Sequence, residues 1–341
     1  MKAIRYYGPE KPLKVEEIEI PKMGDNEVLV KVKAAGICHT DLHFLDGTLT
    51  PWKGELPLTL GHEIAGEIIE VGKNVNKFNK GDRVVLDNKV SCGKCHYCKT
   101  GHENLCADLD QHGFTIDGGY AEVVKTVERT LVELPTDVSY EVGAILPCAT
   151  ASVYHGLVDI AGLQKGEVLM INGFGGLGTN ALQLAKHLGA KTIVTDVSDE
   201  KLMLAKKLGA DATVNVTVSD VGGEIKKLTD GGGGADVVLE LVGTKKAMAN
   251  ALDSLEKAGR YVIIGYTKDK LELSPLNLVV GELKVFGSVS YTHQDLKNVV
   301  KLVHEKKINP VVSQTFRLDD IPEALKLLKQ GKIIGRAVAK P

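Results

Sequence analysis

From about residue 165 onward, short apolar runs alternate with stretches of helical periodicity. Short runs that are rich in β-branched residues and bounded by Gly or Asp predict buried strands. Six such runs are present: EVLMING (167–173), KTIVTD (191–196), DATVNV (211–216), ADVVLELVG (235–243), GRYVIIGY (259–266) and LKVFGSVS (283–290). Helical stretches such as 176–189 and 198–209 lie between them. This alternation predicts an α/β fold with a doubly wound parallel sheet.

The first predicted strand runs directly into GFGGLG. Gly173, Gly175 and Gly178 match G-x-G-x-x-G between a strand and a helix, where glycines let the backbone approach a pyrophosphate at the helix N-terminus. A second glycine run, 231–234, lacks this setting and is predicted to be a flexible loop. The predicted dinucleotide-binding segment therefore consists of Gly173, Phe174, Gly175, Gly176, Leu177 and Gly178.

Asp196 ends the second predicted strand, 18 residues after Gly178. This is close to the spacing at which a carboxylate binds the adenosine ribose hydroxyls. The position favours NAD, because a 2′-phosphate would meet a like charge there and no arginine follows; Lys201 is the nearest cation. The alternative for Asp196 is an ordinary residue at the entry to a helix.

Composition limits the class of protein and of partner. With 341 residues, of which 43% are hydrophobic and 25% charged, the chain is expected to form two domains. A net charge of -2 without a basic run argues against nucleic acid or membrane as the partner, and favours small molecules. The first residues lack the apolar core of a signal peptide, and no membrane-spanning segment is predicted, so we expect a cytoplasmic protein.

Four of the six cysteines lie within SCGKCHYCKTGHENLC, residues 91–106. Their pattern, C-x2-C-x2-C-x7-C, favours structural zinc over a disulfide, since cytoplasmic thiols stay reduced. An iron–sulfur cluster also uses four cysteines and is the alternative. The segment has little apolar material, so a bound zinc would contribute directly to its folding. The four candidate ligands are Cys92, Cys95, Cys98 and Cys106.

The other two cysteines lie more than a hundred residues apart, each beside chemically suggestive neighbours. Cys38 lies in AAGICHTDLHFLDG, and Cys148 lies in LPCATASVYHG. Between them, GHEIAGEIIEVG offers His62 and Glu63 directly after a glycine. Taken singly, a cysteine is usually a small buried hydrophobe and a histidine a hydrogen-bonded residue, so these residues gain meaning only from their shared context.

As a whole, the chain resembles the zinc-containing alcohol dehydrogenases of the medium-chain dehydrogenase/reductase superfamily. The resemblance rests on GICHTDLH, GHEIAGEIIEVG, the four-cysteine segment, LPCATASVYHG and GFGGLG, in the family's order. It implies a GroES-like β-barrel catalytic domain at 1–146 and 285–341, with a structural zinc lobe at 91–106. It also implies a Rossmann NAD-binding domain at 147–284 and a homo-oligomer, with a tetramer favoured over a dimer.

The resemblance further implies two zinc ions per chain. Cys38, His62 and Cys148 match the ligands of the catalytic zinc, and the four-cysteine lobe matches the structural site. Glu63 matches an acid beside the histidine ligand that exchanges with water as a transient ligand. Asp41 matches a carboxylate that orients this histidine.

Further residues match positions of the family's proton relay and cofactor contacts. Thr40 and His43 match the relay that discharges the alcohol proton to solvent. His39, Lys201 and Arg336 match contacts with the cofactor, although surface charges are the alternative for each of the three. Trp52 is placed either in the wall of the substrate pocket or as an anchor at the barrel edge.

The resemblance therefore implies an NAD-dependent zinc alcohol dehydrogenase that interconverts primary or secondary alcohols with aldehydes or ketones. The first alternative is a polyol or amino-alcohol dehydrogenase of the sorbitol or threonine type. Cys148 weighs against it, because the third zinc ligand of those enzymes is commonly a glutamate. The second alternative is a non-catalytic zinc- and NAD-binding structural protein, which the intact ligands and phosphate loop disfavour.

Overall fold

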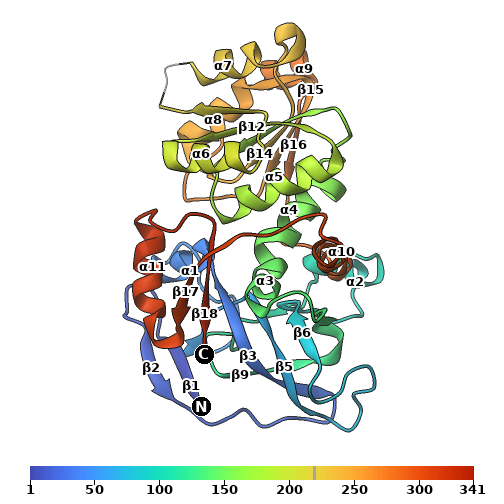
Figure 1. Ribbon diagram of the computed structural model, residues 1–341, viewed down its shortest axis with the longest axis vertical. Helices are drawn as coiled ribbons and strands as arrows, with labels where there is room; N and C mark the ends of the chain where they lie inside the picture. Colours follow the sequence, from blue (N-terminus) through green and yellow to red (C-terminus); the bar gives the residue numbers. More distant parts are fainter. Residues whose placement is uncertain (218–219) are drawn as a thin grey trace. The chain divides into compact units, whose positions relative to one another are not determined.

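The computed structural model comprises 341 residues, and all except 218–219 are described here (Figure 1). The chain divides into two compact units. The first contains residues 1–151, 291–306 and 310–341, and the second contains residues 152–290 and 307–309. The domain boundaries expected at residues 147 and 285 stay predictions.

The first unit is built on a large, mainly antiparallel sheet. Its strands follow the order β10-β6-β5-β3-β18-β17, and β9 pairs with β3. Their bounds are β3 (Glu27–Ile37), β5 (Ile64–Val71), β6 (Arg83–Leu86), β9 (Val123–Val127), β10 (Leu131–Glu133), β17 (Val312–Arg317) and β18 (Arg336–Lys340). A three-stranded sheet contains β1 (Lys2–Tyr6), β2 (Lys14–Glu17) and β4 (Leu58–Thr59), and β7 (Lys89–Val90) pairs with β8 (Asp110–Gln111).

Long-range pairing in this sheet joins the end of the chain to its beginning. Strand β18 pairs with β3 in antiparallel register, with Ala337 opposite Ile37. Strand β5 pairs with the other edge of β3, with Ile64 opposite Ala35. Three segments that are far apart in sequence therefore meet at the carboxyl end of β3.

Helices and helical turns complete the first unit. Buried aliphatic and aromatic side chains such as Tyr6, Phe44, Ile64 and Leu325 form one continuous core between them and the sheet. The helical elements are α1 (His39–Leu45), α2 (His96–Lys99), η1 (Glu103–Leu105), η2 (Glu128–Thr130), α3 (Tyr140–Ile145), η3 (Leu146–Thr150), α10 (His293–His304), η6 (Leu318–Asp320) and α11 (Ile321–Lys329).

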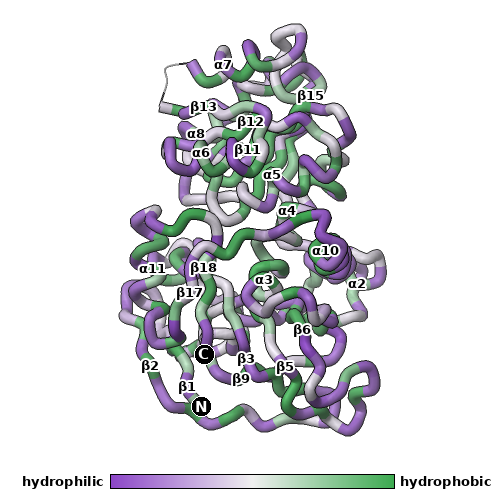
Figure 2. Tube along the Cα trace, viewed as in Figure 1, coloured by the Kyte–Doolittle hydropathy of each residue, from purple (hydrophilic) through white to green (hydrophobic). Residues whose placement is uncertain are grey.

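The second unit is a six-stranded parallel sheet in the order β13-β12-β11-β14-β15-β16. All six predicted strands are confirmed: β11 (Val168–Asn172), β12 (Lys191–Asp196), β13 (Ala212–Asn215), β14 (Ala235–Glu240), β15 (Leu255–Ile263) and β16 (Lys284–Gly287). In Figure 2 the apolar strand segments of this sheet appear green. The order reverses between β11 and β14, and such a switch point is where open α/β sheets bind ligands.

Helices connect the strands of this parallel sheet. They are α5 (Gly176–Leu188), α6 (Asp199–Lys207), α7 (Val221–Lys227), α8 (Lys245–Asp253) and α9 (Pro275–Gly281). A helical run, α4 (Ala151–Tyr154) and η4 (His155–Ile160), precedes the first strand. The glycine run predicted to be a loop contains the turn η5 (Asp230–Gly232), with positive φ angles at Gly231, Gly232 and Gly234.

Glycine is structurally required at two positions of the turn between β11 and α5. Gly173 has a φ of 103°, in the region that side chains rarely adopt. Gly178 lies in the first turn of α5, and a Cβ atom there would overlap the carbonyl oxygen of Gly173. Gly175, in contrast, has open space around the place of its Cβ. The close approach of helix and turn thus depends on Gly178.

Among the helices of residues 1–217 and 220–341, none has the length and apolar character needed to cross a bilayer.

Gly178→Ala is therefore expected to destabilise the protein by about 1–3 kcal/mol, because the added methyl group meets backbone that cannot move aside. An alanine in a helix would otherwise be favourable by up to about 1 kcal/mol. Gly175→Ala is the matched control, and its expected effect is about 1 kcal/mol or less. Urea unfolding of the three proteins measures this difference, and equal stability of the two variants would contradict the packing argument.

Candidate functional site

The first cluster of reactive side chains lies where β3, β5 and the helical turn η3 meet. Cys38, His62, Glu63 and Cys148 each direct a ligand atom into it, and these atoms all lie within 4.8 Å of one another. The two sulfur atoms are 3.8 Å apart. Cys148 lies in a π-helical stretch, a distortion that occurs frequently at functional sites.

The local backbone explains how these residues converge. Cys38 follows β3 and caps the N-terminus of α1, while His62 and Glu63 directly precede β5. The Gly36 N–H donates to the Glu63 carbonyl at 2.8 Å, which fixes the two chain segments together. A Cβ atom at Gly36 would overlap the Glu63 carboxylate. The absence of a side chain at Gly36 therefore creates the space that this acid occupies.

The imidazole of His62 is buried, yet neither of its ring nitrogens has a hydrogen bond of ordinary geometry among the described residues. Its Nδ1 lies 3.6 Å from Oδ1 of Asp41, which is also buried. The second oxygen of Asp41 accepts hydrogen bonds from the Cys38 N–H at 3.0 Å and from the Tyr120 hydroxyl at 2.6 Å. Asp41 is thus held rigidly beside a histidine that still needs a partner for its other nitrogen.

The charges in this cluster are strongly coupled. The hydrogen bond from the Cys148 thiol, together with the nearby Arg336 and His62, holds the pKa of Cys38 well below its usual range. The same hydrogen bond raises the pKa of Cys148. Burial would lower the pKa of His62, but the negative charge of Cys38 and Asp41 outweighs it and raises this pKa. The cluster thus attracts a positive charge.

A zinc ion fits this donor set. Thiolate and imidazole are ligands that zinc prefers, and two cysteines with one histidine leave a fourth position open. Zinc–sulfur bonds of about 2.3 Å place two thiolates about 3.8 Å apart. The observed Cys38–Cys148 separation of 3.8 Å matches this value without any movement of the two side chains. An unpartnered ring nitrogen of His62 would supply the third ligand atom.

Arg336 contacts this cluster directly, which sequence reasoning missed. Its buried guanidinium donates to both carboxylate oxygens of Glu63, one at 3.1 Å, and to the sulfur of Cys148 at 3.5 Å. Burial raises the pKa of Glu63 to about 7, although the Arg336 charge opposes this rise. The pairing of β18 with β3 places Arg336 here, and that register was the missing signal. The predicted contact of Arg336 with a cofactor remains a prediction.

Helix α1 carries the three residues expected to serve proton transfer or cofactor binding. Thr40 Oγ1 lies 3.5 Å from the Cys38 sulfur. His39 and His43 are one turn apart, and their rings lie edge to face with centroids 5.5 Å apart. Burial, aided by the charge of His39, lowers the pKa of His43. His43 is therefore neutral near pH 7 and able to accept a proton.

Trp52 is 52% exposed. Its ring lies 5.8 Å from that of Phe114, which in turn lies 5.1 Å from the ring of His62. Phe114, which sequence reasoning did not single out, thus separates Trp52 from the histidine. Both roles considered for Trp52, pocket wall and barrel-edge anchor, are compatible with these contacts.

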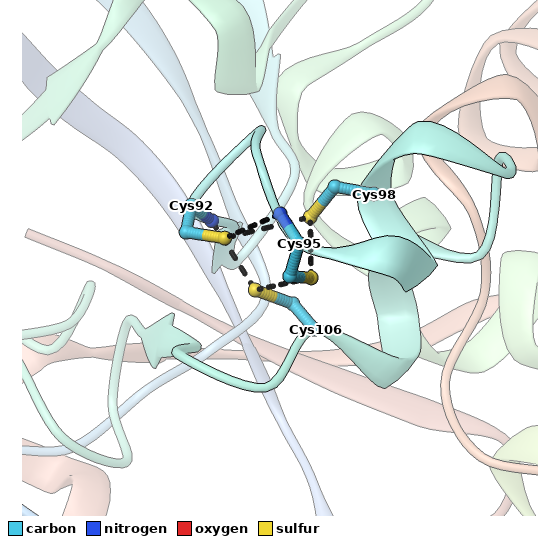
Figure 3. Close-up of side chains that lie close together, drawn as sticks. All are labelled: Cys92, Cys95, Cys98 and Cys106. Carbon is cyan, nitrogen blue, oxygen red and sulfur yellow. Dashed lines mark hydrogen bonds between the residues drawn. The ribbon is translucent and has the colours of Figure 1, made fainter.

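The second cluster is the four-cysteine lobe (Figure 3). The sulfur atom of Cys95 lies 3.5 Å from that of Cys98 and 4.0 Å from that of Cys106, and the sulfur atoms of Cys92 and Cys98 are 4.0 Å apart. These separations again match a tetrahedron around one zinc ion, with edges of about 3.8 Å. A cluster of several iron atoms is larger than a single ion and needs more widely spaced thiolates. The geometry therefore favours one ion.

Backbone amides also prepare the lobe for anionic sulfur. The Cys92 N–H donates to the Cys106 sulfur at 3.2 Å, and the Cys95 N–H donates to the Cys92 sulfur at 3.4 Å. Hydrogen bonds from backbone amides lower the pKa of Cys95 to about 6. All six cysteines of the chain are unpaired thiols.

The third site is the glycine turn of the second unit. The Phe174 N–H donates to one oxygen of Asp196 at 2.8 Å, and the Ser198 N–H donates to the other at 3.0 Å. The Lys201 ammonium lies 3.7 Å from the same carboxylate. Asp196 thus links the glycine turn to the start of α6. Its predicted contact with a ribose remains a prediction, as does that of Lys201.

Comparisons with known proteins bear on the family and the fold of this chain. A family model described as an alcohol dehydrogenase GroES-like domain matches residues 24–136, and one described as a zinc-binding dehydrogenase matches residues 176–305. The structure resembles the crystal structure of the alcohol dehydrogenase from Aeropyrum pernix with a TM-score of 0.94, at 34% identity and over 100% of both chains.

Curated relatives align over the whole chain. An alcohol dehydrogenase of Geobacillus stearothermophilus is 38% identical, with 100% of this chain and 99% of the relative covered. Two proteins of Sulfurisphaera tokodaii are similar over 100% of both chains: an NAD-dependent alcohol dehydrogenase at 36% identity and an acryloyl-coenzyme A reductase at 35%. The chain therefore belongs to the zinc-containing alcohol dehydrogenase family, whose members are oxidoreductases with a GroES-like domain and a Rossmann-type domain.

Proposed function

We propose that this protein is an NAD-dependent alcohol dehydrogenase that oxidises small primary or secondary alcohols to aldehydes or ketones and also catalyses the reverse reaction. The convergence of Cys38, His62 and Cys148 into one close-set group of zinc-type ligands carries this proposal. Relatives named as alcohol dehydrogenases, one of them NAD-dependent, support it.

We assign two zinc ions to each chain. Cys38, His62 and Cys148 hold the catalytic ion, and the lobe of residues 91–106 holds the structural one. Zinc bound at a three-ligand site supplies a Lewis acid that makes an alcohol proton easier to remove and polarises a carbonyl in reverse. Glu63 offers a further carboxylate oxygen beside these ligands.

Asp41 keeps His62 in the orientation that the ligand set needs. It lies beside Nδ1 of the imidazole and is itself fixed by the Tyr120 hydroxyl and the Cys38 N–H. A carboxylate in this place selects the tautomer whose Nε2 is free to bind a metal. Asp41 thus acts on the reaction through His62.

Thr40 and His43 form the proposed path of the alcohol proton. They are three residues apart on α1 and therefore lie on the same face of the helix. Thr40 lies next to the Cys38 sulfur and can accept a hydrogen bond from a substrate hydroxyl there. It takes up that proton as it passes its own hydroxyl proton on, by way of the nicotinamide ribose, toward His43. His43 is held neutral by burial and can take up the proton before it reaches solvent.

The glycine turn of residues 173–178 is proposed to bind the NAD pyrophosphate at the N-terminus of α5. Asp196 binds the adenosine ribose and disfavours a 2′-phosphate by its charge, with Lys201 as a further ribose contact. His39 and Arg336 are assigned contacts with the pyrophosphate. For Arg336 this role comes in addition to its bonds to Glu63.

A second candidate function is reduction of an activated carbon–carbon double bond, or oxidation of a polyol or amino alcohol. The acryloyl-coenzyme A reductase at 35% identity over the whole chain favours the first of these. Cys148 as third ligand favours simple alcohols over polyols.

The experiment that tests the proposed function is a substrate panel of ethanol, cyclohexanol, sorbitol and threonine with NAD+, and of acryloyl-coenzyme A with NADH. If the enzyme turned over only sorbitol, only threonine or only acryloyl-coenzyme A, the proposal of a simple alcohol as substrate would be wrong.

We further propose a homo-oligomer, with a tetramer favoured over a dimer. Helix α9 exposes Leu276 and Val279, whose exposed fractions are 70% and 75%. Among the described residues, the neighbouring strand β16 pairs with β15 alone and so leaves one edge open. Exposed apolar side chains beside an open sheet edge are typical of an interface with a second copy.

Unpaired thiols throughout the chain support the proposed cytoplasmic location.

Val279→Glu is expected to reduce the oligomer to a smaller species, because each copy would place a charge in the apolar contact. Light scattering after size exclusion measures the mass. Met203→Glu on α6 is the matched control, since Met203 is also exposed but lies on a different helix, and its mass should equal that of the wild type. An unchanged mass for Val279→Glu would disprove this interface.

Cys148→Ser is expected to remove one zinc per chain and to reduce turnover at least about a hundredfold, because a hydroxyl replaces a thiolate ligand. Binding of NAD+ should change little, since the glycine turn lies in the other unit. Elemental mass spectrometry, steady-state kinetics and NAD+ titration measure the three quantities. Full activity with the zinc retained would show that Cys148 is not a ligand.

Cys95→Ser provides the opposite test. Loss of the lobe zinc is expected to lower the melting temperature by about 5–10 °C, while molecules that remain folded keep their intrinsic turnover. Thermal unfolding and activity per folded molecule are measured beside Cys148→Ser, which serves as control. A normal melting temperature with abolished turnover would contradict a structural role for the lobe.

A further inference from the structure

A row of buried polar side chains crosses four neighbouring strands of the parallel sheet near its carboxyl end. Thr195 on β12 donates its hydroxyl to the Asn172 side-chain oxygen on β11 at 2.8 Å. The Asn172 amide donates to Glu240 Oε2 on β14 at 2.7 Å. The hydroxyl of Tyr261 on β15 donates to the same oxygen at 3.1 Å. Nothing in the proposed mechanism uses this row.

Glu240 is the centre of the row, and its side chain is fully buried. Its other oxygen, Oε1, accepts hydrogen bonds from the backbone N–H groups of Val242 at 2.7 Å and Gly243 at 2.8 Å. All four donors to the carboxylate are neutral. A buried carboxylate is costly unless hydrogen bonds satisfy it, so these four bonds strongly constrain the groups that make them. One result is that the turn 241–243 is tied to the end of β14.

This turn packs against the glycine turn that is proposed to bind the cofactor. The Leu241 N–H donates to the Asn172 carbonyl at 3.0 Å, directly before Gly173. The side chain of Val242 fills the space beside Gly173, where a Cβ atom would lie only 2.7 Å from it. Asn172 and Glu240 are register partners on β11 and β14, the two strands of the switch point. Glu240 therefore fixes the turn 241–243 beside the glycine turn, at the switch point of the sheet.

The two sides of the switch point bind different halves of a dinucleotide. In a doubly wound sheet, each set of three strands forms one mononucleotide-binding half. Asp196, the proposed ribose ligand, ends β12 and belongs to the adenosine half. The turn 241–243 follows β14 and so belongs to the other half, which takes the nicotinamide mononucleotide.

We infer that Glu240 is a positioning residue for the nicotinamide half of the bound cofactor, which it serves by holding the turn 241–243 in place. The inference rests on the proposed NAD site. It predicts that loss of the carboxylate weakens binding of the whole dinucleotide, whereas binding of a ligand that fills only the adenosine half is unaffected.

Glu240→Gln tests this inference. The glutamine side chain has the same shape, but one of its two ends is an NH2 group, which cannot accept the hydrogen bonds that a carboxylate oxygen accepts. The dissociation constants of NAD+ and of AMP are measured by calorimetric titration of the full chain. The expected result is an NAD+ constant about tenfold higher, with the AMP constant within about twofold of wild type. A purely structural role would weaken both ligands alike, and that outcome would overturn the inference, as would unchanged NAD+ binding.

Asp236→Asn is the matched control. Asp236 lies at the amino end of the same strand, where its carboxylate accepts a hydrogen bond from the Val168 N–H at 2.8 Å. An asparagine keeps an acceptor there, and both constants should stay within about twofold of wild type. A loss of NAD+ affinity in this variant equal to that of Glu240→Gln would show that the site is merely sensitive to any change in β14, and would overturn the inference.

Tyr261→Phe keeps the test open if Glu240→Gln does not fold. It removes one of the four donors and leaves the carboxylate in place. The expected result is the same selective loss on a smaller scale, about threefold for NAD+ and none for AMP. Unchanged NAD+ binding, or equal losses for both ligands, would contradict the inference. The wild-type protein tests the proposed cofactor separately. If it binds neither NAD+ nor AMP, the proposed NAD site is wrong, whatever the role of Glu240.

Discussion

The need to compensate buried negative charge organises the first unit of this protein. Cys38, Glu63 and Asp41 are buried close to the half-buried Cys148, and burial of such groups is costly without a positive partner. Arg336 supplies part of the compensation by bridging Glu63 and Cys148. A zinc ion bound by the two sulfurs and the neutral imidazole of His62 would supply the rest. The pairing of β18 with β3 is therefore part of the site as well as of the fold.

The second unit applies the same principle with hydrogen bonds instead of cations. Glu240 is as deeply buried as Glu63, but neutral donors from two neighbouring strands and one turn satisfy its oxygens. A carboxylate that depends on neutral donors fixes their positions without adding a charge partner. In this way the ends of β11, β14 and β15 are held in one arrangement, on which the proposed cofactor site depends.

The strands of the parallel sheet could be predicted because each apolar run contains its own signal. Three ends differ noticeably: β14 and β16 end three residues before the predicted 243 and 290, and β15 covers 255–263 instead of 259–266. Strand β15 begins early because Leu255 pairs with Ala235 ahead of a shift in register. The candidate ligands could be found from spacing within short segments and from family resemblance. The bonds of Arg336 to Glu63 could not, because they depend on the register of strands separated by most of the chain. The row through Glu240 was missed for the same reason, since its four members come from four strands.

The central claim is that each chain holds two zinc ions in different sulfur environments. Zinc analysis combined with X-ray absorption at the zinc edge, on protein purified without added metal, tests it most directly. The account predicts two zinc ions per chain with an average of about three sulfur ligands each, because one site has four thiolates and the other two. A single zinc with four sulfur ligands would contradict it, since the centre of Cys38, His62 and Cys148 would then not bind the metal on which the proposed chemistry depends.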